Sequence, residues 1–548
     1  MDPFPTEPVQ TKKSGIRWGR LLLGSILLSV TGGVVYLSYG IYEQRNPNEQ
    51  APADPTKKTL VILGSGWGSV SLLKKLDTEN YNVIVVSPRN YFLFTPLLPS
   101  CPTGTIEHRS IMEPIRHILR HKKTEVKYYE AEATEIDHEK RVVKVSDLSD
   151  IKGDVHSTEI PFDYLVVGVG AESATFGKTD CGVMFAGIPG VKEHACFLKE
   201  IQDSQKLRKN VMDCIETALF KEQSPEEVER LLSMVVVGGG PTGVEFAAEL
   251  QDFFENDLKK WMPELADKFK VTLVEALPNV LPMFSKALID YTEKSFRDEK
   301  IDVRTKTMVK NVGDKYIDVE AILPDGSKEK QRIPYGCLVW ATGNAIRPVI
   351  RNLMNKIPEQ KTARRGLAVN DYLVVDGTEG IWAVGDCAQS KYAPTAQVAS
   401  QQGAYLARLF NSMERKEIIE SEIEQLKELE ASSSAADDKT ALQKTLAKKD
   451  RELKKFAKIS SFEYTHQGSL AYIGMDRAVA DVSLWGGNVA SAGGLTFLFW
   501  RSAYLSMVFS TRNRVLVIMD WLKVKVFGRD VSRFVLLVPL MTRMVTNI

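Results

Sequence analysis

Two short glycine-rich stretches carry the residue types best suited to chemistry, because each can bind the pyrophosphate of a dinucleotide. The first holds Gly64, Gly66 and Ser69, and the second spans residues 238–243. Glycine allows a tight turn and a close approach of backbone N–H groups to an anion, with the positive end of a helix dipole behind. Each stretch follows an apolar run and precedes a helical pattern, so the spacing predicts two nucleotide sites in one chain.

The second stretch is the more complete of the two. An apolar run at residues 271–274 ends in Glu275, and neither of the next two residues is arginine. A carboxylate at this position can accept both ribose hydroxyls and repels a 2′-phosphate, so the pattern predicts NADH rather than NADPH. The expected contacts are Gly238, Gly240, Pro241, Thr242, Gly243 and Glu275.

The first stretch is chemically incomplete. Its third glycine position is Ser69, and the following strand-like run ends in Ser87 where an acid is usual. The support comes from far along the chain, where Asp386 follows a strand-like run and a glycine. A carboxylate there is suited to accept hydrogen bonds from the ribityl hydroxyls of FAD. We therefore expect FAD at this stretch.

These residues need two βαβ units to position them. Strand, glycine turn, helix and strand follow one another near residues 59–86 and again near 234–274. The predicted fold class is α/β, with two Rossmann-like dinucleotide-binding domains. We expect an FAD-binding domain in two parts, residues 59–190 and 335–412, on either side of an NADH-binding domain at residues 191–334.

Residues 1–58 are expected to hold a transmembrane helix and a linker. Residues 21–42 carry no charge, and their length is about that needed to cross the ~30 Å hydrocarbon core. Basic residues lie almost entirely on the N-terminal side, which predicts that the catalytic body lies across the membrane from them. A cleaved secretory segment and a buried core helix are the alternatives.

Two further regions follow the nucleotide domains. Residues 413–458 are dense in Glu and Lys with apolar residues at helical spacing, which predicts a charged, exposed helical hairpin. A partner-binding coiled coil is the alternative. Residues 459–548 mix aromatic and apolar residues with cations, a composition typical of a helix in a membrane interface. We expect a membrane-anchoring region that contacts lipid, and a helix that packs on the domain surface is equally open.

The composition excludes several classes. The formal net charge is +1, so no general affinity for nucleic acid is expected. The six cysteines include no C-x-x-C pair, which excludes a redox dithiol at short spacing and makes a disulfide framework improbable. No spacing typical of a metal, heme or iron–sulfur site occurs, so no metal is expected.

Several segments resemble the type II NADH:quinone oxidoreductases of mitochondria, also called alternative NADH dehydrogenases, and in particular their external type. The segments are 87–99 (SPRNYFLFTPLLP), 236–245 (VVGGGPTGVE), 340–344 (WATGN), 383–388 (AVGDCA) and 394–403 (PTAQVASQQG). The resemblance covers roughly residues 57–412 and 462–534. The last of the quoted segments is the most specific to the family.

The resemblance implies a single FAD that is reduced by NADH and reoxidised by membrane ubiquinone, insensitive to rotenone and without proton pumping. It implies that Glu245 lies near the nicotinamide and that Gln397 and Gln401 border the flavin at the quinone entrance. Their spacing of four residues puts both amides on one helix face. Further cofactor contacts implied are Ser65, Trp67, Ser87, Pro96, Ala171, Thr342, Gly343 and Asp386.

The expected location is the mitochondrial inner membrane. The N-terminal segment favours an active site in the intermembrane space, with a matrix-facing site as the alternative, and a homodimer is a further expectation. Two rival functions remain open. One is a disulfide reductase or sulfide:quinone reductase of the same fold, which could use distant cysteines such as Cys181 and Cys337. The other is a non-enzymatic NADH-sensing flavoprotein, which only the charged hairpin supports.

Overall fold

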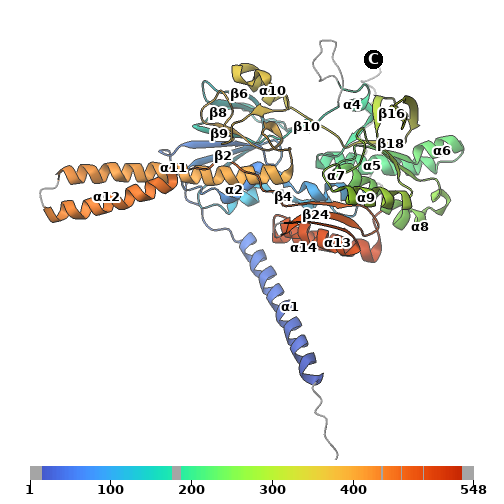
Figure 1. Cartoon of the computed structure of the whole chain (residues 1–548), viewed down its shortest axis with the longest axis horizontal. Coiled ribbons are helices and arrows are strands. Elements are labelled where there is room, and N and C mark those ends of the chain that lie inside the picture. The colour runs from blue at the N-terminus through green and yellow to red at the C-terminus, as the bar shows by residue number, and fades with distance from the viewer. Residues whose placement is uncertain (1–14, 176–186, 433–435, 458, 485–486, 533–548) are drawn as a thin grey trace, which may run out of the picture. The chain divides into compact units, whose positions relative to one another are not determined.

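The computed structural model of the chain describes residues 15–175, 187–432, 436–457, 459–484 and 487–532 (Figure 1). The chain divides into two units, Met1–Glu49 and Gln50–Ile548. Within its described residues the second unit contains two five-stranded sheets and several smaller ones. The predicted α/β class is therefore confirmed.

The first five-stranded sheet carries the first glycine stretch. Its order is β21-β9-β1-β2-β5, and all neighbours are parallel. Its central strands read as continuous apolar runs because helices and loops bury both faces. The strands are β1 (Thr59–Leu63), β2 (Asn82–Ser87), β5 (Lys127–Glu130), β9 (Tyr164–Val167) and β21 (Ile381–Ala383).

Two helices meet beside this sheet at a glycine contact. Helix α2 (Trp67–Lys75) packs against α11 (Ala396–Ser432). A Cβ atom added to Gly403 of α11 would lie 2.0 Å from the carbonyl oxygen of Gly68 in α2. The absence of a side chain at position 403 therefore allows the two backbones to approach closely.

The second five-stranded sheet carries the second glycine stretch. Its order is β11-β18-β12-β13-β14, again parallel throughout. The strands are β11 (Cys196–Phe197), β12 (Ser233–Val237), β13 (Lys270–Val274), β14 (Asp302–Arg304) and β18 (Cys337–Trp340). The helices of this half are α4 (Val191–His194), α5 (Ile201–Ala218), α6 (Pro225–Leu231), α7 (Pro241–Phe253), α8 (Lys259–Trp261) and α9 (Lys286–Asp298).

The pairing of β18 differs from the expected domain boundary. We expected the first domain to resume at residue 335, but β18 pairs with β12 in the second sheet. The chain contacts the first half again at β19 (Asn344–Ala345), which pairs with β10 (Glu172–Ser173), and then at α10 (Pro348–Lys356), which packs on β6 (Glu132–Asp137). A buried apolar strand fits the interior of either parallel sheet, so its pattern could not identify the sheet that it joins.

Each five-stranded sheet is accompanied by a three-stranded antiparallel sheet. The first consists of β6, β7 (Val142–Ser146) and β8 (Ser157–Pro161), and the second of β15 (Thr307–Val312), β16 (Tyr316–Ile322) and β17 (Lys328–Pro334). Short pairs complete the set: β3 (Tyr91–Leu93) with β4 (Met112–Pro114), which precedes α3 (Ile115–Arg120), β10 (Glu172–Ser173) with β19 (Asn344–Ala345), and β20 (Leu367–Ala368) with β22 (Ala388–Gln389).

The C-terminal region is a compact layer of strands and helices. An antiparallel sheet of β23 (Ser469–Tyr472), β24 (Ala478–Leu484) and β25 (Gly487–Gly493) packs with α13 (Gly494–Met507), and α14 (Thr511–Phe527) follows. The helix expected within residues 459–548 is thus confirmed. Ser510 caps α14 by accepting from Asn513 N, and its hydroxyl donates to the buried Glu113 carboxylate at 2.7 Å.

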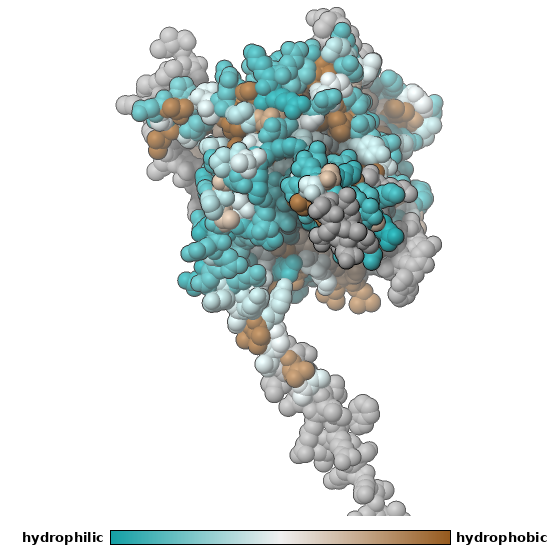
Figure 2. All heavy atoms as spheres, turned by 90° about the vertical axis from the view of Figure 1, so that its left-hand side faces the viewer, coloured by the Kyte–Doolittle hydropathy of each residue, from teal (hydrophilic) through white to brown (hydrophobic). Residues whose placement is uncertain are grey.

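The charged segment forms the predicted helical hairpin from α11 and α12 (Ala436–Ala457). Ile419, Ile423 and Leu446 are buried between the two arms. Figure 2 faces the tip of this hairpin, and the coloured side chains around it are mostly hydrophilic. Helix α11 runs without a break from Ala396, so the expected boundary at residue 413 lies inside a helix.

The N-terminal unit contains α1 (Gly15–Arg45), which includes the helix expected at residues 21–42. Among the described residues, however, no helix combines the length and the hydropathy that a membrane span requires. Residues 21–42 lack charge but include many Gly, Ser, Thr and Tyr residues, which contribute little hydrophobicity. The transmembrane prediction is therefore not supported.

Candidate functional site

A cavity of about 380 Å³ opens where the two nucleotide-binding halves meet. Its wall is built from the segments that follow the carboxyl ends of β1, β9 and β21 in the first sheet and β18 in the second. Ligands of parallel α/β sheets bind at this edge because loops there can vary without disturbing the strands. Gly66, Trp67, Ala171, Thr342 and Gly343, all predicted from the sequence, line the cavity.

The first glycine stretch has the geometry of an anion-binding turn. Gly64 adopts φ +98°, and a Cβ there would lie 2.3 Å from the Gly168 carbonyl oxygen, so only glycine fits. Gly66 precedes α2 with no protein atom within 4 Å of where its Cβ would be. The open face at Gly66 and the helix N-terminus behind it fit the pyrophosphate of FAD.

Three predicted serines lie behind this turn rather than in the cavity. Ser87 donates to Ser65 Oγ at 3.0 Å and accepts from the Arg89 backbone N–H at 3.2 Å. Ser65 donates in turn to the Tyr91 carbonyl, also at 3.0 Å. Ser69 Oγ lies 3.4 Å from the Leu63 carbonyl. The three serines therefore stabilise the turn. Ser87 has a structural role at a position where an acidic residue is usual.

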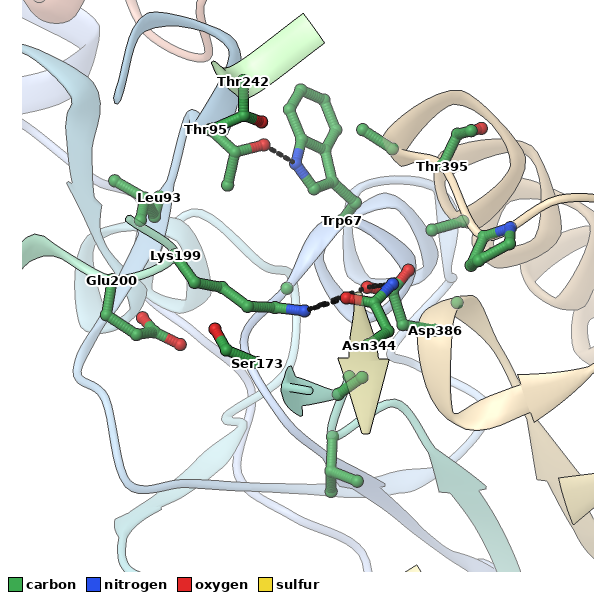
Figure 3. Close-up of a pocket in the computed structure, with 18 of the residues that line it drawn as sticks. Trp67, Leu93, Thr95, Ser173, Lys199, Glu200, Thr242, Asn344, Asp386 and Thr395 are labelled. Atoms are coloured by element: carbon green, nitrogen blue, oxygen red, sulfur yellow. Dashed lines mark hydrogen bonds and ion pairs between the residues drawn. The ribbon is translucent and has the colours of Figure 1, made fainter. Parts of the chain in front are cut away.

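A cluster of three polar side chains, Lys199, Asn344 and Asp386, spans the cavity from one nucleotide-binding half to the other (Figure 3). Lys199 Nζ donates to Asn344 Oδ1 at 2.6 Å and lies 3.6 Å from Asp386 Oδ2, and Asn344 Nδ2 lies 3.5 Å from the same oxygen. Burial lowers the pKa of Lys199, which the nearby Asp386 opposes. Asp386 was predicted, whereas Lys199 belongs to no motif and no sequence signal indicated it.

The wall also contains polar residues that were not predicted as site residues, namely Arg89, Thr95, Glu200 and Arg347. Glu200 accepts from Arg89 Nη1 at 2.5 Å and lies 3.9 Å from Arg347 Nη2. Trp67 Nε1 donates to Thr95 Oγ1 at 3.0 Å, as Figure 3 shows. Pro96 follows Thr95 but does not itself line the cavity. Of these, only Arg89 lay next to a predicted strand end.

The second glycine stretch has the same turn geometry. Gly238 adopts φ +120°, and a Cβ on Gly240 would meet no protein atom within 4 Å. Thr242, at the start of α7, lines the cavity. Glu275 stands at the end of β13 and accepts from the Gly239 N–H at 2.5 Å and the Leu277 N–H at 2.7 Å. The carboxylate is thereby fixed against the glycine turn, where the ribose of NADH is expected.

Replacing Glu275→Gln is expected to raise the NADPH-to-NADH ratio of kcat/KM about tenfold or more. The amide keeps one acceptor for the backbone but removes the charge that repels a 2′-phosphate, and each 1.4 kcal/mol corresponds to a factor of ten. Steady-state rates with both nucleotides measure the ratio. Glu329→Gln, an exposed change on β17, is the matched control, and an unchanged ratio in Glu275→Gln would refute the ribose role.

The two predicted glutamines share a helix face, but both amides contact the protein itself. Gln397 donates to the Gly468 carbonyl at 2.8 Å and accepts from the Tyr464 hydroxyl at 3.0 Å. Gln401 donates to the Thr465 carbonyl at 2.8 Å and accepts from the Thr465 N–H at 3.0 Å. The two glutamines hold residues 464–468 against α11. Neither glutamine lines the cavity, although their neighbours Thr395, Ala396 and Ala399 do line it.

Replacing both Gln397 and Gln401 with alanine is expected to lower the free energy of unfolding by about 2–4 kcal/mol. Each amide donates one hydrogen bond to residues 464–468 and accepts at least one from them, and a lost bond costs about 1 kcal/mol. Denaturant titration of the purified holoenzyme measures the loss. Gln443→Ala in the exposed hairpin is the control, and a double variant as stable as that control would contradict the anchoring role.

Glu245 is buried below the C-terminal layer and does not line the cavity. Its Oε1 accepts from the Tyr472 N–H at 3.1 Å. Burial raises the pKa of Glu245 to about 8, and the nearby Glu249 adds to the rise. A carboxyl group with such a pKa can exchange a proton near neutral pH.

Replacing Glu245→Gln is expected to raise the melting temperature at pH 8 but not at pH 5. Because the pKa of Glu245 is higher in the folded state than its ordinary 4.5, the folded chain holds a proton that the unfolded chain loses. The wild type therefore loses stability as the pH rises between about 4.5 and 8, whereas glutamine does not titrate. Calorimetry at both pH values tests this, and an equal difference at both would contradict it.

The cysteines that the structure describes give the cavity no dithiol. The Cys196 and Cys337 thiols lie next to each other on β11 and β18, and the contact lowers the pKa of Cys196 to about 7. Both residues are buried, and neither lines the cavity. Cys181, named for the sulfide:quinone alternative, lies outside the described residues. The described cysteines therefore do not support that rival function.

Comparisons with known proteins agree with this geometry. The family model described as pyridine nucleotide-disulphide oxidoreductase matches residues 58–403, and the NDH2 C-terminal domain matches residues 466–530. The NDH2 of Plasmodium falciparum, solved in complex with NADH, is 27% identical with a TM-score of 0.72, covering 87% of this chain and all of that one. A sulfide:quinone oxidoreductase from Aquifex aeolicus, 15% identical with a TM-score of 0.56, shows the shared fold alone.

Two curated relatives match almost end to end. The external alternative NADH-ubiquinone oxidoreductase of Yarrowia lipolytica is 61% identical, with 97% of this chain and 90% of the relative covered. The external NADH-ubiquinone oxidoreductase 2 of Saccharomyces cerevisiae is 48% identical, with 91% of this chain and 88% of the relative covered. The chain therefore belongs to the pyridine nucleotide-disulphide oxidoreductases and, among them, to the mitochondrial external alternative NADH-ubiquinone oxidoreductases.

Proposed function

We propose that this chain is an NADH:ubiquinone oxidoreductase that uses FAD, oxidises NADH and reduces ubiquinone without pumping protons. The observation that carries the proposal is the shared cavity, which Gly66 and Trp67 line from the first glycine stretch and Thr242 from the second. Two nucleotides bound at these turns would meet in one space. The two relatives from Yarrowia lipolytica and Saccharomyces cerevisiae are named NADH-ubiquinone oxidoreductases, which agrees with this chemistry.

The residues of the cavity supply binding and orientation. FAD, when bound, supplies the capacity to take a hydride from NADH and to pass on two electrons. The N–H groups at Gly66 would hold its pyrophosphate, and Asp386, kept in place by Lys199 and Asn344, would accept from its ribityl hydroxyls. Gly240, Thr242 and Glu275 would hold NADH. The chain's part is to fix distance and direction and to exclude water.

We assign the quinone side to the start of α11 and to the layer that covers Glu245. Gln397 and Gln401 fix residues 464–468 beside the cavity, so they would shape the quinone entrance by positioning this segment. Glu245, whose pKa lies near 8, would exchange a proton when ubiquinone becomes ubiquinol. Reduction of one quinone by one NADH consumes one proton from the medium, so such a group is needed.

The test of this function is NADH oxidation by the purified holoenzyme with decylubiquinone as acceptor. We expect turnover far above the rate with oxygen alone, and that turnover should be insensitive to rotenone. Absence of stimulation by decylubiquinone would overturn the quinone assignment. Sulfide offered in place of NADH provides the contrast with the sulfide:quinone reductases that share the fold.

We further propose that the enzyme acts as a homodimer on the inner mitochondrial membrane, with its active site in the intermembrane space. Exposed apolar residues of α13 and α14, among them Leu498, Phe499, Leu522 and Phe527, would contact lipid together with nearby cations. Protease added to mitochondria with a ruptured outer membrane should digest the catalytic body. Protection would place that body in the matrix, and light scattering of the detergent-solubilised protein would give the oligomeric state.

A further inference from the structure

A second cavity, of about 480 Å³, lies away from the first one. It opens between α7 and α8 on one side and α13 and the end of α14 on the other. Its inner wall holds Tyr472, Trp500 and Trp521, all buried, together with the buried carboxylates of Glu249 and Asp252. The two cavities share no lining residue, so the second plays no part in the proposed binding of FAD or NADH.

The carboxylates of this cavity are already engaged by the protein. Arg529 lies 3.3 Å from Glu249 and 3.0 Å from Asp257. Asp252 accepts from the Tyr472 hydroxyl and from the Met475 N–H. Asp476 pairs with Lys525 at 3.4 Å. Each acid that lines the cavity therefore has at least one partner in the protein, with Arg529 shared by Glu249 and Asp257.

Two cations of the same cavity lack an acidic partner among the described residues. Within the described ranges, neither Lys260 nor Arg501 forms an ion pair, although both line the cavity. Arg501 Nε is buried and donates to no atom of the described chain. The cavity thus offers two cations without an ion pair and one buried N–H donor without an acceptor, the features that an anionic group recognises.

The geometry of Arg501 suits such an anion. Its guanidinium carbon lies 4.4 Å from the centre of the Phe497 ring and 4.8 Å from that of Trp521. Stacking on rings fixes the plane of a guanidinium and leaves its edge donors free for oxygen acceptors. Burial lowers the pKa of Arg501, so an anion in the cavity would also compensate its lost hydration.

The mouth of the cavity is apolar and exposed. Trp261 is 69% exposed, Val526 69% and Phe527 81%, and all three line it. They are continuous with the exposed apolar residues of α13 and α14 that we assigned to the lipid contact. A ligand that fits must therefore combine an anionic head with an apolar chain leaving at the mouth, and the lipid surface beside it supplies such molecules.

We propose that this second cavity binds the phosphate head group of one anionic phospholipid, with Arg501 and Lys260 as its ligands and the acyl chains lying over Trp261, Val526 and Phe527. The inference rests on the proposed membrane association of the C-terminal region. It adds a defined lipid site to that general contact.

Native mass spectrometry of the full-length holoenzyme in detergent tests the site. Phosphatidylglycerol and phosphatidylcholine are titrated separately, and inorganic phosphate serves as a competitor. We expect one phosphatidylglycerol to bind about tenfold more tightly than phosphatidylcholine, because both carry the phosphate but only the quaternary ammonium of phosphatidylcholine is repelled by the two cations of the cavity. Arg501→Gln and Lys260→Gln should each reduce the preference, and Arg451→Gln and Lys330→Gln, exposed changes elsewhere, should not.

Three results would overturn the proposal: equal binding of the two lipids, a preference that survives both cavity variants, or displacement of the lipid by millimolar phosphate alone. Flavin content confirms that each variant is folded, and Lys260 is exposed enough for its replacement to leave the core intact. Turnover with NADH and decylubiquinone in the same detergent is measured in parallel. Loss of turnover with retained lipid preference would refute the proposed function and leave this site standing.

Discussion

A Gly66→Val protein is expected to fold and to purify without FAD. Gly66 has φ −84° and ψ −170°, an extended conformation open to any residue, and its missing Cβ faces empty space. Valine is therefore compatible with the fold but occupies the place of the pyrophosphate. Losing two charge-assisted hydrogen bonds of about 1.5–3 kcal/mol each weakens binding roughly 10²-fold or more. Flavin absorbance per protein, beside the circular dichroism spectrum, measures the effect.

Gly240→Val is the matched variant, because Gly240 has the same extended backbone and the same empty space before α7. This protein should keep its flavin and show a KM for NADH raised about 10²-fold, for the same reason. The two variants thus separate the sites by different readouts. If Gly66→Val retained full flavin, or if both variants lost it equally, the assignment of one nucleotide to each turn would be wrong.

The second large effect is expected at Arg529, which joins the C-terminal region to α7 and the segment after it. Its guanidinium is only 7% exposed and bonds to Glu249, Asp257 and the Thr105 hydroxyl. Replacing Arg529→Met leaves two buried carboxylates without their cation. Breaking a buried ion pair in this way costs about 3–5 kcal/mol. Denaturant titration should show this loss, and limited proteolysis should cut first near the C-terminal layer.

Arg332→Met provides the comparison, because Arg332 pairs with Asp318 at 2.9 Å on the surface and is 60% exposed. An exposed pair contributes about 0–1 kcal/mol, so this variant should unfold almost like the wild type. Equal losses for Arg332→Met and Arg529→Met would show that burial does not decide the strength of the C-terminal attachment.

Local chemistry explains which parts of the site were predictable. The turns at Gly64 and Gly238 need glycine for a reason that lies within a few residues, so their spacing alone identified them. Asp386 followed a strand end and was predicted with them. Lys199 reaches Asp386 from another part of the chain, and a lone lysine has no local signal. The partner of a side chain across a fold is set by tertiary packing.

Gln397, Gln401 and β18 show the same limit of prediction from a single sequence. The spacing of Gln397 and Gln401 correctly gave a shared face, but it could not reveal that residues 464–468 occupy that face. The apolar residues of β18 suit a buried strand, but either of two similar parallel sheets could have accepted it. A single sequence therefore predicted the elements, and the contacts between distant elements required the fold.

Helix α11 has a mechanical consequence. It is one uninterrupted rod of 37 residues, about 55 Å long at ~1.5 Å per residue, and its first turns form part of the cavity wall. The rod is held to the body as far as Glu417, since Phe410, Asn411 and Glu417 bond to Tyr81, Lys75 and Lys58. Beyond that point its buried side chains pack against α12. A force on the hairpin tip is therefore taken up by this long attachment before it reaches the cavity wall.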